Sequence, residues 1–226
     1  MSTSAKVTAR QRIENLLDDN SFVEIGAYVK ARNTDFNIQA KDTPSDGVIT
    51  GYGVINGGLV YVYSQDASVL GGSVGEMHAK KIASLYDMAM KTGSPVIGLI
   101  DSTGLRLQES VDGLNAFGQI YMKQSLASGV IPTVTAIFGN CGGGLSIVAG
   151  LSDFTFMEVE NAQLFVNSPN AITENRKEIC DNASAKFQSE EAGNVDFVGT
   201  EAEVIEGIRN LVSVLPSNNE DEASDL

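Results

Sequence analysis

The stretch Gly139-Asn140-Cys141-Gly142-Gly143-Gly144-Leu145 decides how the rest of the chain is interpreted, and it directly follows the apolar run Val130–Phe138. The apolar run predicts a strand, and Leu145–Gly150 predicts a short buried helix after the glycines. Glycine has no β-carbon, so a ligand can approach the backbone closely and peptide N–H groups can face it. The first N–H groups of a helix lack partners inside it and carry the positive end of its dipole. Such a turn suits a developing oxyanion, and we interpret it as the catalytic centre.

The composition indicates a single globular domain. The chain has 226 residues, of which 42% are hydrophobic and 19% charged, and its formal net charge is −14. That length accommodates one large core rather than two domains. The excess of acidic residues disfavours nucleic acid and anionic membrane surfaces as partners. Part of this charge lies in the stretch 217–226, which we predict to be a flexible tail behind a domain that spans residues 1–216.

Few residues offer side-chain chemistry. The cysteines Cys141 and Cys180 and the single His78 make no zinc-type cluster, so no metal site is predicted. We interpret Cys141 as a small packing residue, because no neighbouring base would activate it. Ser73 and Ser102 lack a His–carboxylate relay, so a hydrolase triad is not expected. No signal peptide and no bilayer-spanning run is recognisable, which predicts a cytoplasmic protein.

Strands and helices are predicted to alternate along the chain, which indicates an α/β fold with a mostly parallel sheet. Asn56-Gly57-Gly58 predicts a hairpin between two early strands. Apolar periodicity predicts the other elements, and Thr92-Gly93-Ser94-Pro95 predicts the end of the helix that begins near residue 76. The expected helices are 8–18, 76–91, 107–127, 145–150 and 201–215, with a polar helical stretch after 169. The expected strands are 47–55, 59–64, 96–100, 130–138, 154–159 and 163–166, with an extended segment at 22–29 and a loop at 30–45.

Three glycine-bearing turns follow predicted strands: Gly71-Gly72-Ser73, Asp101-Ser102-Thr103-Gly104-Leu105 and Gly142-Gly143-Gly144. In parallel α/β sheets, ligands bind where strands end and helices begin, so we expect the turns to converge. Each turn alone also fits a purely structural role, and none has dinucleotide-binding or P-loop spacing. Arg106 and Glu109, three residues apart, are interpreted as a surface ion pair or as groups that orient the turn.

Further motifs follow one another in a fixed order: TARQRI at 8–13, NGGLVYVYSQD at 56–66, GGS at 71–73, RLQE at 106–109, SGVIP at 128–132 and LSDFTFM at 151–157. This ordered set resembles the N-terminal half of the biotin-dependent acyl-CoA carboxyltransferases. That family includes the propionyl-CoA carboxylase β subunit and the glutaconyl-CoA and methylmalonyl-CoA decarboxylases. The resemblance runs from about residue 8 to residue 216, and its specificity lies in the order of the motifs rather than in any single one.

The resemblance implies a crotonase-like ββα superhelix in a single domain, with a coenzyme A thioester as substrate. It implies an enzyme that transfers a carboxyl group between carboxybiotin and the α-carbon of an acyl-CoA. The catalytic groups that it implies are backbone N–H groups that hold the thioester oxygen as an enolate, at Leu105, Gly143 and Gly144, with Gly104 beside them. The substrate-binding residues that it implies are Gly71, Gly72, Ser73, Ser102, Thr103 and Gly142.

The resemblance also implies partners. Family subunits carry a second homologous domain that binds biotin, so we expect a separate chain to supply that C-terminal half, together with a biotinyl carrier protein. The expected assembly is a homo- or hetero-oligomer, cytoplasmic or peripheral to a membrane decarboxylase complex. Thr103-Gly104-Leu105 stands where the family commonly has Gly-Gly-Ala, which predicts a narrower pocket. Two alternatives remain open: a malonate decarboxylase β-type subunit acting on a malonyl thioester, and a non-catalytic CoA-binding or assembly subunit.

Overall fold

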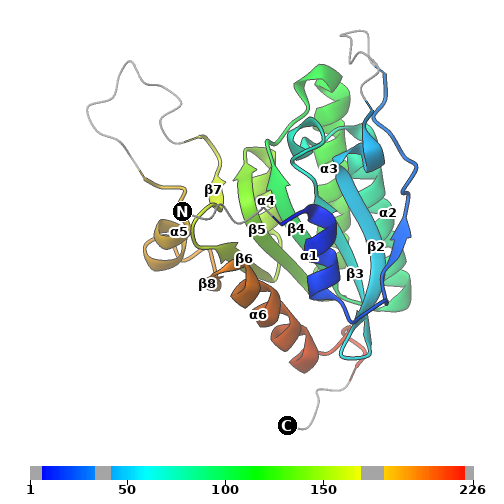
Figure 1. Ribbon diagram of the computed structural model, residues 1–226, viewed down its shortest axis with the longest axis vertical. Coiled ribbons are helices and arrows are strands. Elements are labelled where there is room, and N and C mark those ends of the chain that lie inside the picture. The colour runs from blue at the N-terminus through cyan, green and yellow to red at the C-terminus, as the bar shows by residue number, and fades with distance from the viewer. Residues whose placement is uncertain (1–6, 34–41, 169–180, 222–226) are drawn as a thin grey trace.

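The computed structural model describes residues 7–33, 42–168 and 181–221. They form an eight-stranded sheet with helices on both faces (Figure 1), which confirms the predicted α/β fold. The strand order is β1-β2-β3-β4-β5-β6-β8, and β7 pairs with the end of β5. The strands are β1 (Val23–Ile25), β2 (Val48–Ile55), β3 (Gly58–Gln65), β4 (Val96–Ser102), β5 (Thr133–Gly142), β6 (Phe154–Glu158), β7 (Gln163–Phe165) and β8 (Phe197–Gly199). The α-helices are α1 (Ala9–Leu16), α2 (Glu76–Thr92), α3 (Ser110–Ala127), α4 (Gly144–Gly150), α5 (Ala185–Glu190) and α6 (Glu201–Val214).

The sheet begins with the predicted hairpin. Strands β2 and β3 are antiparallel, and Ile55 lies opposite Gly58. The two turn residues between them, Asn56 and Gly57, have φ angles of 50° and 83°. Such left-handed pairs match the twist of a two-residue hairpin, which explains the Asn-Gly sequence. From β3 onward the paired strands are parallel, so each is followed by a crossover that carries a helix or a turn.

The two faces of the sheet bury separate apolar cores. Val60 and Val62 of β3 belong to the core that includes Ile13 of α1 and residues of α6. Tyr61 and Tyr63, which alternate with them, belong to the core under α2 and α3. Figure 1 shows α1 and α6 on one face of the sheet. The central strand β4 is buried along its whole length, as expected for a parallel strand covered on both sides.

Capping residues define the ends of α1 and α2, and the one predicted among them, Gly93, is confirmed. Thr8 and Gln11 form a capping box at the start of α1, with the Gln11 N–H donating to Thr8 Oγ1 over 3.2 Å. Gly93 closes α2 in the left-handed conformation, with φ 61°. These ends fix the lengths of the helices, and through them the positions at which the strands begin.

Several boundaries differ from the prediction. The predicted helix 107–127 is interrupted, because Leu107–Glu109 form a separate 3-10 turn and Ser110 has a φ angle of 47°. Strand β5 continues through the first glycines to Gly142, where it pairs with β7. Strand β8 was missed because only three residues form it. Residues 169–180 of the polar helical stretch predicted after 169 lie outside the described residues, and the part that is described contains the short helix α5 at Ala185–Glu190. The middle of the loop 30–45 also lies outside the described residues.

The segment after α6 begins differently from the tail expected from residue 217. The side-chain amide of Asn218 donates to the Gly93 carbonyl over 3.0 Å, and the Asn219 N–H donates to the Val130 carbonyl over 2.9 Å. These bonds hold the turn at 217–221 against the ends of α2 and α3. Residues 222–226 lie outside the described part of the chain.

Candidate functional site

The three glycine turns meet, as the sequence predicts. The Thr103 N–H donates to the Gly71 carbonyl over 2.9 Å, which joins the turn after β4 to the turn before α2. A β-carbon on Gly104 would stand 3.3 Å from the Gly142 carbonyl oxygen, which places the turn after β4 against the triple glycine. The carboxyl ends of β4 and β5 therefore form one site with the segment that precedes α2.

The turn after β4 leaves one N–H group free. Val74 donates its N–H to the Gly104 carbonyl over 2.8 Å, and Arg106 donates its N–H to the Val74 carbonyl over 3.0 Å. In this parallel bridge the Gly104 carbonyl and the Arg106 N–H both bind Val74. The Leu105 N–H, which lies between them along the chain, therefore points to the opposite side. No hydrogen-bond partner of this N–H occurs among the residues that the structure describes.

The triple glycine differs in part from the expectation. The Gly143 N–H donates to the Phe165 carbonyl over 3.0 Å, so it is not a free donor. The Gly144 N–H has no partner within the described ranges, and the Gly144 carbonyl accepts a hydrogen bond from the Tyr121 hydroxyl over 2.6 Å. Gly143 has φ 59° and ψ −125°, a conformation that requires glycine. The expected set of donors is thus reduced to Leu105 and Gly144.

Other expected site residues form hydrogen bonds within the protein. The Ser102 hydroxyl, which is buried, donates to the Gly72 carbonyl over 2.6 Å and accepts the Gly104 N–H over 3.1 Å. The buried Ser73 hydroxyl accepts the Nε–H of Arg106 over 3.1 Å. The polar groups of Ser102 and Ser73 and the N–H of Gly104 therefore hold the turns together, and the ligand contacts expected for them stay a prediction.

The remaining expected site residues differ in how closely their surroundings are packed. A β-carbon on Gly72 would stand 2.4 Å from the Asp101 carbonyl, and one on Gly142 would stand 2.5 Å from the ring of Phe165. Both positions thus need glycine for close packing. Thr103 is exposed, and its side chain lies over Gly71, so it remains at the surface of the site.

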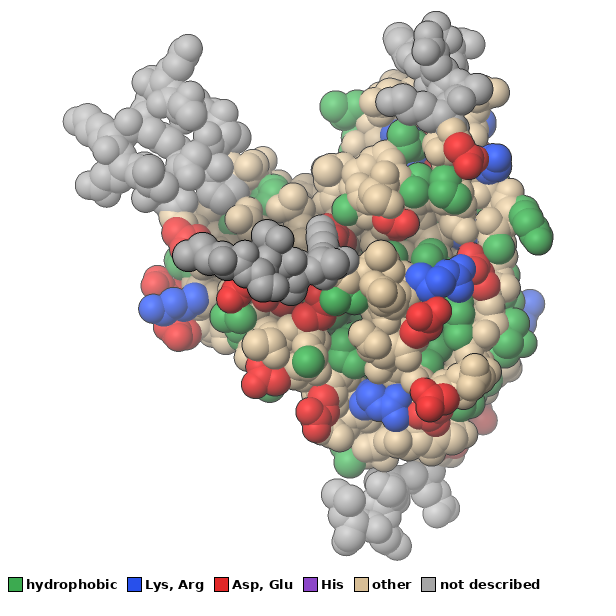
Figure 2. All heavy atoms as spheres, in the orientation of Figure 1, with side chains coloured by type: hydrophobic (Ala, Val, Ile, Leu, Met, Phe, Trp, Pro, Cys, Tyr) green, Lys and Arg blue, Asp and Glu red, His purple; other side chains and the backbone are tan. Residues whose placement is uncertain are grey.

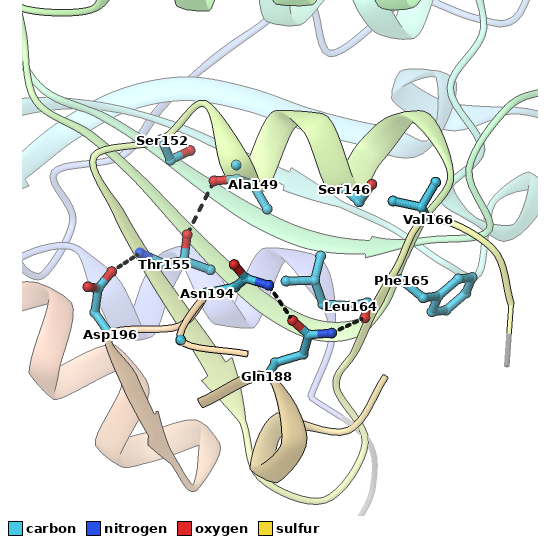
Figure 3. A pocket seen from close by; sticks show the side chains of 12 residues that line it. Ser146, Ala149, Ser152, Thr155, Leu164, Phe165, Val166, Gln188, Asn194 and Asp196 are labelled. Carbon is cyan, nitrogen blue, oxygen red and sulfur yellow. Dashed lines mark hydrogen bonds between the residues drawn. The ribbon is translucent and has the colours of Figure 1, made fainter. Parts of the chain in front are cut away.

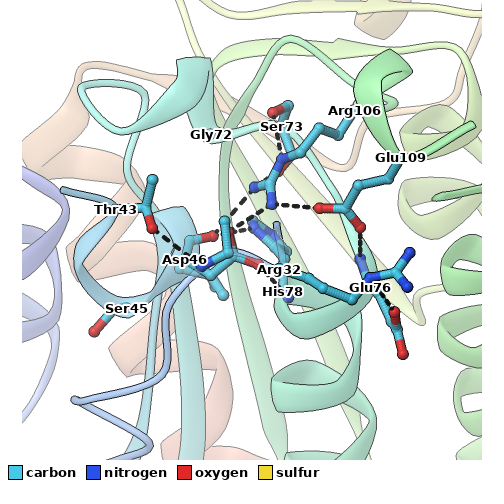
Figure 4. A network of polar contacts seen from close by, with 12 residues as sticks. Arg32, Thr43, Ser45, Asp46, Gly72, Ser73, Glu76, His78, Arg106 and Glu109 are labelled. Carbon is cyan, nitrogen blue, oxygen red and sulfur yellow. Dashed lines mark hydrogen bonds and ion pairs between the residues drawn. The ribbon is translucent and has the colours of Figure 1, made fainter. Parts of the chain in front are cut away.

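A buried cluster of charged groups lies behind the turns (Figure 4). The guanidinium of Arg106 is 1% exposed and contacts Asp46 Oδ1 over 2.6 Å, Glu109 Oε1 over 3.0 Å and the Ser73 carbonyl over 2.6 Å. Of the two interpretations of Arg106 and Glu109, the surface ion pair is wrong because both side chains are buried, whereas groups that orient the turn agree with the contact of Arg106 to Ser73. Sequence reasoning missed Asp46, because it lies 60 residues from Arg106 along the chain. The sequence signal that could have been used is Gly75, which stands before α2 where a capping side chain is usual and so indicates that another residue binds the first N–H groups of this helix.

Burial shifts the pKa values of groups near the site. Desolvation raises the pKa of Asp46, although Arg106 opposes the shift. Desolvation, together with the positive charge of Arg106, lowers the pKa of His78 to about 3. Burial raises the pKa of Cys141 to about 12. Neither His78 nor Cys141 can act as a base or a thiolate near neutral pH, which agrees with the interpretation of Cys141 as a packing residue.

A second buried arginine holds the other end of the turn. Arg12 of α1 contacts Asp101 Oδ2 over 3.4 Å and Glu201 Oε1 over 2.9 Å. Its guanidinium also lies over the Phe138 ring, 4.6 Å from the centroid. A β-carbon on Gly139 would stand 2.0 Å from Asp101 Oδ1, so this glycine leaves room for the carboxylate.

A pocket of about 410 Å³ adjoins the triple glycine on the side of Phe165 (Figure 3). Its polar side chains are hydrogen-bonded among themselves and to the backbone: Gln188 Nε2 donates to the Leu164 carbonyl over 3.1 Å, and Asn194 donates to Gln188 Oε1 over 2.9 Å. The pocket is lined by Ser146, Ala149, Gly150, Ser152, Thr155, Leu164, Phe165, Val166, Gln188, Gly193, Asn194 and Asp196.

The charge of the chain is unevenly distributed. Figure 2 shows acidic side chains gathered over α5 and α6 on the face that it presents. Helix α6 contributes acidic residues from its first turn onward. Within the described ranges, no helix combines the length and the apolar character needed to cross a membrane.

The fold defines a crotonase-like α/β protein, in which a hairpin and repeated strand–helix units carry glycine turns at the strand ends. The family model of the carboxyl transferase domain matches residues 2–226, and the chain belongs to that family.

Relatives of known name agree with this membership. The chain is 43% identical over 227 residues to the methylmalonyl-CoA decarboxylase subunit alpha of Propionigenium modestum, covering 99% of this chain and 44% of the relative. It is 42% identical to the propionyl-CoA carboxylase beta chain of Roseobacter denitrificans, covering 95% of this chain and 43% of the relative. The chain thus spans less than half the length of these relatives.

Solved structures give the same fold. Transcarboxylase 12S, crystallised with hydrolysed methylmalonyl-coenzyme A, superposes with a TM-score of 0.90 at 38% identity, over 96% of this chain and 43% of that chain. The Pseudomonas malonate decarboxylase MdcD–MdcE hetero-dimer superposes with a TM-score of 0.75 at 27% identity, over 93% of this chain and 88% of that chain.

Proposed function

We propose that this chain binds the acyl-CoA of a carboxyltransferase and stabilises its enolate while a carboxyl group moves to or from carboxybiotin. In this proposal the N–H groups of Leu105 and Gly144 donate to the thioester oxygen. The observation that carries it is that these two N–H groups, on adjoining turns, have no partner among the described residues. Donors that are already in place when negative charge develops stabilise it without reorganisation.

The proposal relies on the backbone because nearby side chains cannot supply the chemistry. His78 and Cys141 are buried, and their pKa values of about 3 and about 12 keep both uncharged near neutral pH. Helix α4 has only seven residues, so its dipole adds little to the donor at Gly144. When bound, carboxybiotin would supply the carboxyl group and, after losing it, a basic group.

The partners are part of the proposal. We infer that a separate chain supplies the biotin-binding half, and that a biotinyl carrier protein delivers carboxybiotin. The likeness in fold to the malonate decarboxylase MdcD–MdcE hetero-dimer, a relative assembled from two different chains, supports a two-chain arrangement. Hydrolysed methylmalonyl-coenzyme A bound to transcarboxylase 12S supports an acyl-CoA ligand for this fold.

A malonate decarboxylase β-type subunit is the second candidate. Its support is the likeness in fold to malonate decarboxylase, with a TM-score of 0.75 over 93% of this chain. Sequence identity favours the first candidate, with 43% to the methylmalonyl-CoA decarboxylase subunit against 27% to the malonate decarboxylase chain.

Amide chemical shifts of the ¹⁵N-labelled chain test the binding step. Acetyl-, propionyl-, malonyl-, methylmalonyl- and glutaconyl-CoA are titrated separately, with free coenzyme A as the matched control that lacks the thioester oxygen. We expect the Leu105 and Gly144 resonances to shift with at least one thioester and not with free coenzyme A. Equal responses to thioester and free coenzyme A, or no response at either residue, would remove both amides from the mechanism.

Carboxyl transfer tests the catalytic step. The chain is assayed with its proposed partner chain and a carboxylated biotinyl carrier, and each component is omitted in turn. Turnover that needs all components supports the first candidate, and turnover with malonyl thioester on an acyl carrier without biotin supports the second. Thioester binding without turnover in any mixture supports a non-catalytic CoA-binding or assembly subunit.

A further inference from the structure

Arg106 binds the segment Ser73-Val74 with both its backbone and its side chain. Its N–H donates to the Val74 carbonyl over 3.0 Å, in the bridge that turns the Leu105 N–H outward. Its guanidinium donates to the carbonyl and to the hydroxyl of Ser73, over 2.6 and 3.1 Å. The two adjacent residues Ser73 and Val74 are thus bound by Arg106 at three points.

Two carboxylates hold the guanidinium in turn. Asp46 and Glu109 both contact Arg106 Nη1, and both carboxylate side chains are fully buried. The second oxygen of Glu109 accepts the N–H of Glu76 over 2.5 Å, and the second oxygen of Asp46 accepts the N–H of His78 over 2.8 Å. The cluster therefore connects the segment before β2, the first turn of α2 and the turn after β4 (Figure 4).

Stability alone does not explain such a cluster. Burying charged groups costs free energy that their attraction only partly offsets, and apolar side chains of similar volume often stabilise as well. The cluster also requires glycine at position 75, because a β-carbon there would stand 2.3 Å from Glu109 Oε1. A planar guanidinium with fixed donor directions sets the relative positions of its acceptors, which an apolar contact does not.

We propose that Arg106 is a positioning residue, which fixes the peptide between Gly104 and Leu105 so that the Leu105 N–H remains directed away from Val74. Asp46 and Glu109 keep the guanidinium in the single orientation that this needs. The direction of the Leu105 N–H is inferred from the hydrogen bonds alone. That this N–H binds a thioester oxygen rests on the proposed function.

The test compares Arg106→Lys with Arg209→Lys. Lysine keeps the charge but loses the fork of donors. Arg209 is a matched control, because it also donates to a carbonyl, of Leu16 over 2.6 Å, and pairs with a carboxylate, of Asp18 over 2.7 Å, away from the turns. In the ligand-free chain we expect the Leu105 amide resonance to move in Arg106→Lys and to stay in place in Arg209→Lys. An unmoved Leu105 resonance in folded Arg106→Lys would overturn the proposal.

Kinetics separate positioning from binding. A misplacement of about 1 Å in a reacting group can cost on the order of 10²-fold in rate, so we expect kcat of Arg106→Lys to fall by that order while KM for acyl-CoA changes little. A rise in KM with unchanged kcat would contradict positioning. If Arg106→Lys does not fold, Ser73→Ala, which removes one of the three contacts, replaces it under the same criteria.

The two proposals fail in different ways. If no thioester shifts the Leu105 amide of the wild-type chain, the proposed function fails. The comparison of ligand-free resonances still decides whether Arg106 positions this peptide.

Discussion

The Cδ1 atom of Leu105 lies 2.9 Å from the point at which a β-carbon on Gly113 would stand. Leu105 belongs to the triplet Thr103-Gly104-Leu105 that was expected to narrow the pocket, and Gly113 lies in the first turn of α3. The larger side chain packs against the core at the place that Gly113 leaves open. The narrowing expected from Thr103-Gly104-Leu105 therefore depends on the exposed Thr103, because the bulk of Leu105 is directed toward α3.

Gly113→Ala should destabilise the chain through this contact. Alanine gains up to about 1 kcal/mol in a helix, but forcing an extra carbon into a packed site costs about 1–3 kcal/mol, so we expect a net loss in the free energy of unfolding. Leu105→Ala in the same chain should remove the clash and restore part of the loss. Urea unfolding of the single and double variants measures the coupling, and strictly additive losses would contradict the pairing.

Gly143→Ala should lose stability for a different reason. A β-carbon there meets no atom within 4 Å, but φ 59° with ψ −125° is unfavourable for any other residue. We expect a loss of about 1–3 kcal/mol in the free energy of unfolding. Gly118→Ala is the control, because Gly118 lies in α3, has equal room and is not among the glycines of positive φ. Equal effects of the two substitutions in urea unfolding would exclude backbone strain at Gly143.

Ser102→Ala separates a structural role from ligand binding. The substitution leaves the buried Gly72 carbonyl and Gly104 N–H without their partner, which we expect to cost about 1–3 kcal/mol of unfolding free energy. It should lower kcat with little change in KM, because Ser102 supports the turn rather than contacting substrate. Ser125→Ala, at an exposed position of α3, should change neither quantity. A rise in KM alone would restore Ser102 to the substrate-binding residues.

His78 should make the chain sensitive to acid. Its Nδ1 lies 3.0 Å from the Asp46 carbonyl, which can only accept, so the neutral ring donates there. The folded pKa of about 3 lies below the ordinary value of 6.5, so the unfolded chain binds the extra proton and stability falls as pH decreases from about 6.5 toward 3. The slope from this group approaches about 1.4 kcal/mol per pH unit.

The measurement compares wild type with His78→Asn, whose side-chain amide can still donate to Asp46. The raised pKa of Asp46 acts with the opposite sign but is present in both proteins, and Lys81, with a pKa of about 8, titrates outside the window. Urea unfolding between pH 6.5 and 4.5, a window that follows from the shift of His78, should show a steeper loss for wild type. Parallel pH profiles would count against this role of His78.

Cys141 should be unreactive in the native chain. Its thiol is buried, donates to the Leu145 carbonyl over 3.3 Å and has a pKa raised to about 12. In a Cys180→Ser background we expect iodoacetamide to modify Cys141 only after unfolding, as measured by intact mass. Cys141→Ala should retain carboxyl transfer. Loss of carboxyl transfer in this variant would point to a catalytic thiol.

The sequence was sufficient for the parts of the fold that depend on local chemistry. Asn56-Gly57 predicted the hairpin because both residues tolerate positive φ, and Gly93 predicted the end of α2 for the same reason. The convergence of the glycine turns was predictable, because the carboxyl ends of parallel strands share one edge of a sheet.

The rest depended on contacts between distant residues. Nothing local predicts that the Gly143 N–H pairs with the Phe165 carbonyl, since that bond needs the position of β7. The burial of Arg106 likewise needs Asp46, which only the folded sheet brings to it. A spacing of three residues between Arg106 and Glu109 describes a surface pair and a buried pair equally well.

The contacts of Arg12 have a consequence for the order in which the chain matures. This side chain lies in the first helix, yet one of its acceptors, Glu201, begins the last helix, and the other, Asp101, immediately precedes the turn after β4. During synthesis, Asp101 leaves the ribosome about a hundred residues before Glu201. Arg12 can therefore reach its final geometry only after translation has produced the start of α6, and a nascent chain stalled before that point would lack one of the two ion pairs that hold this side chain beside the turn after β4.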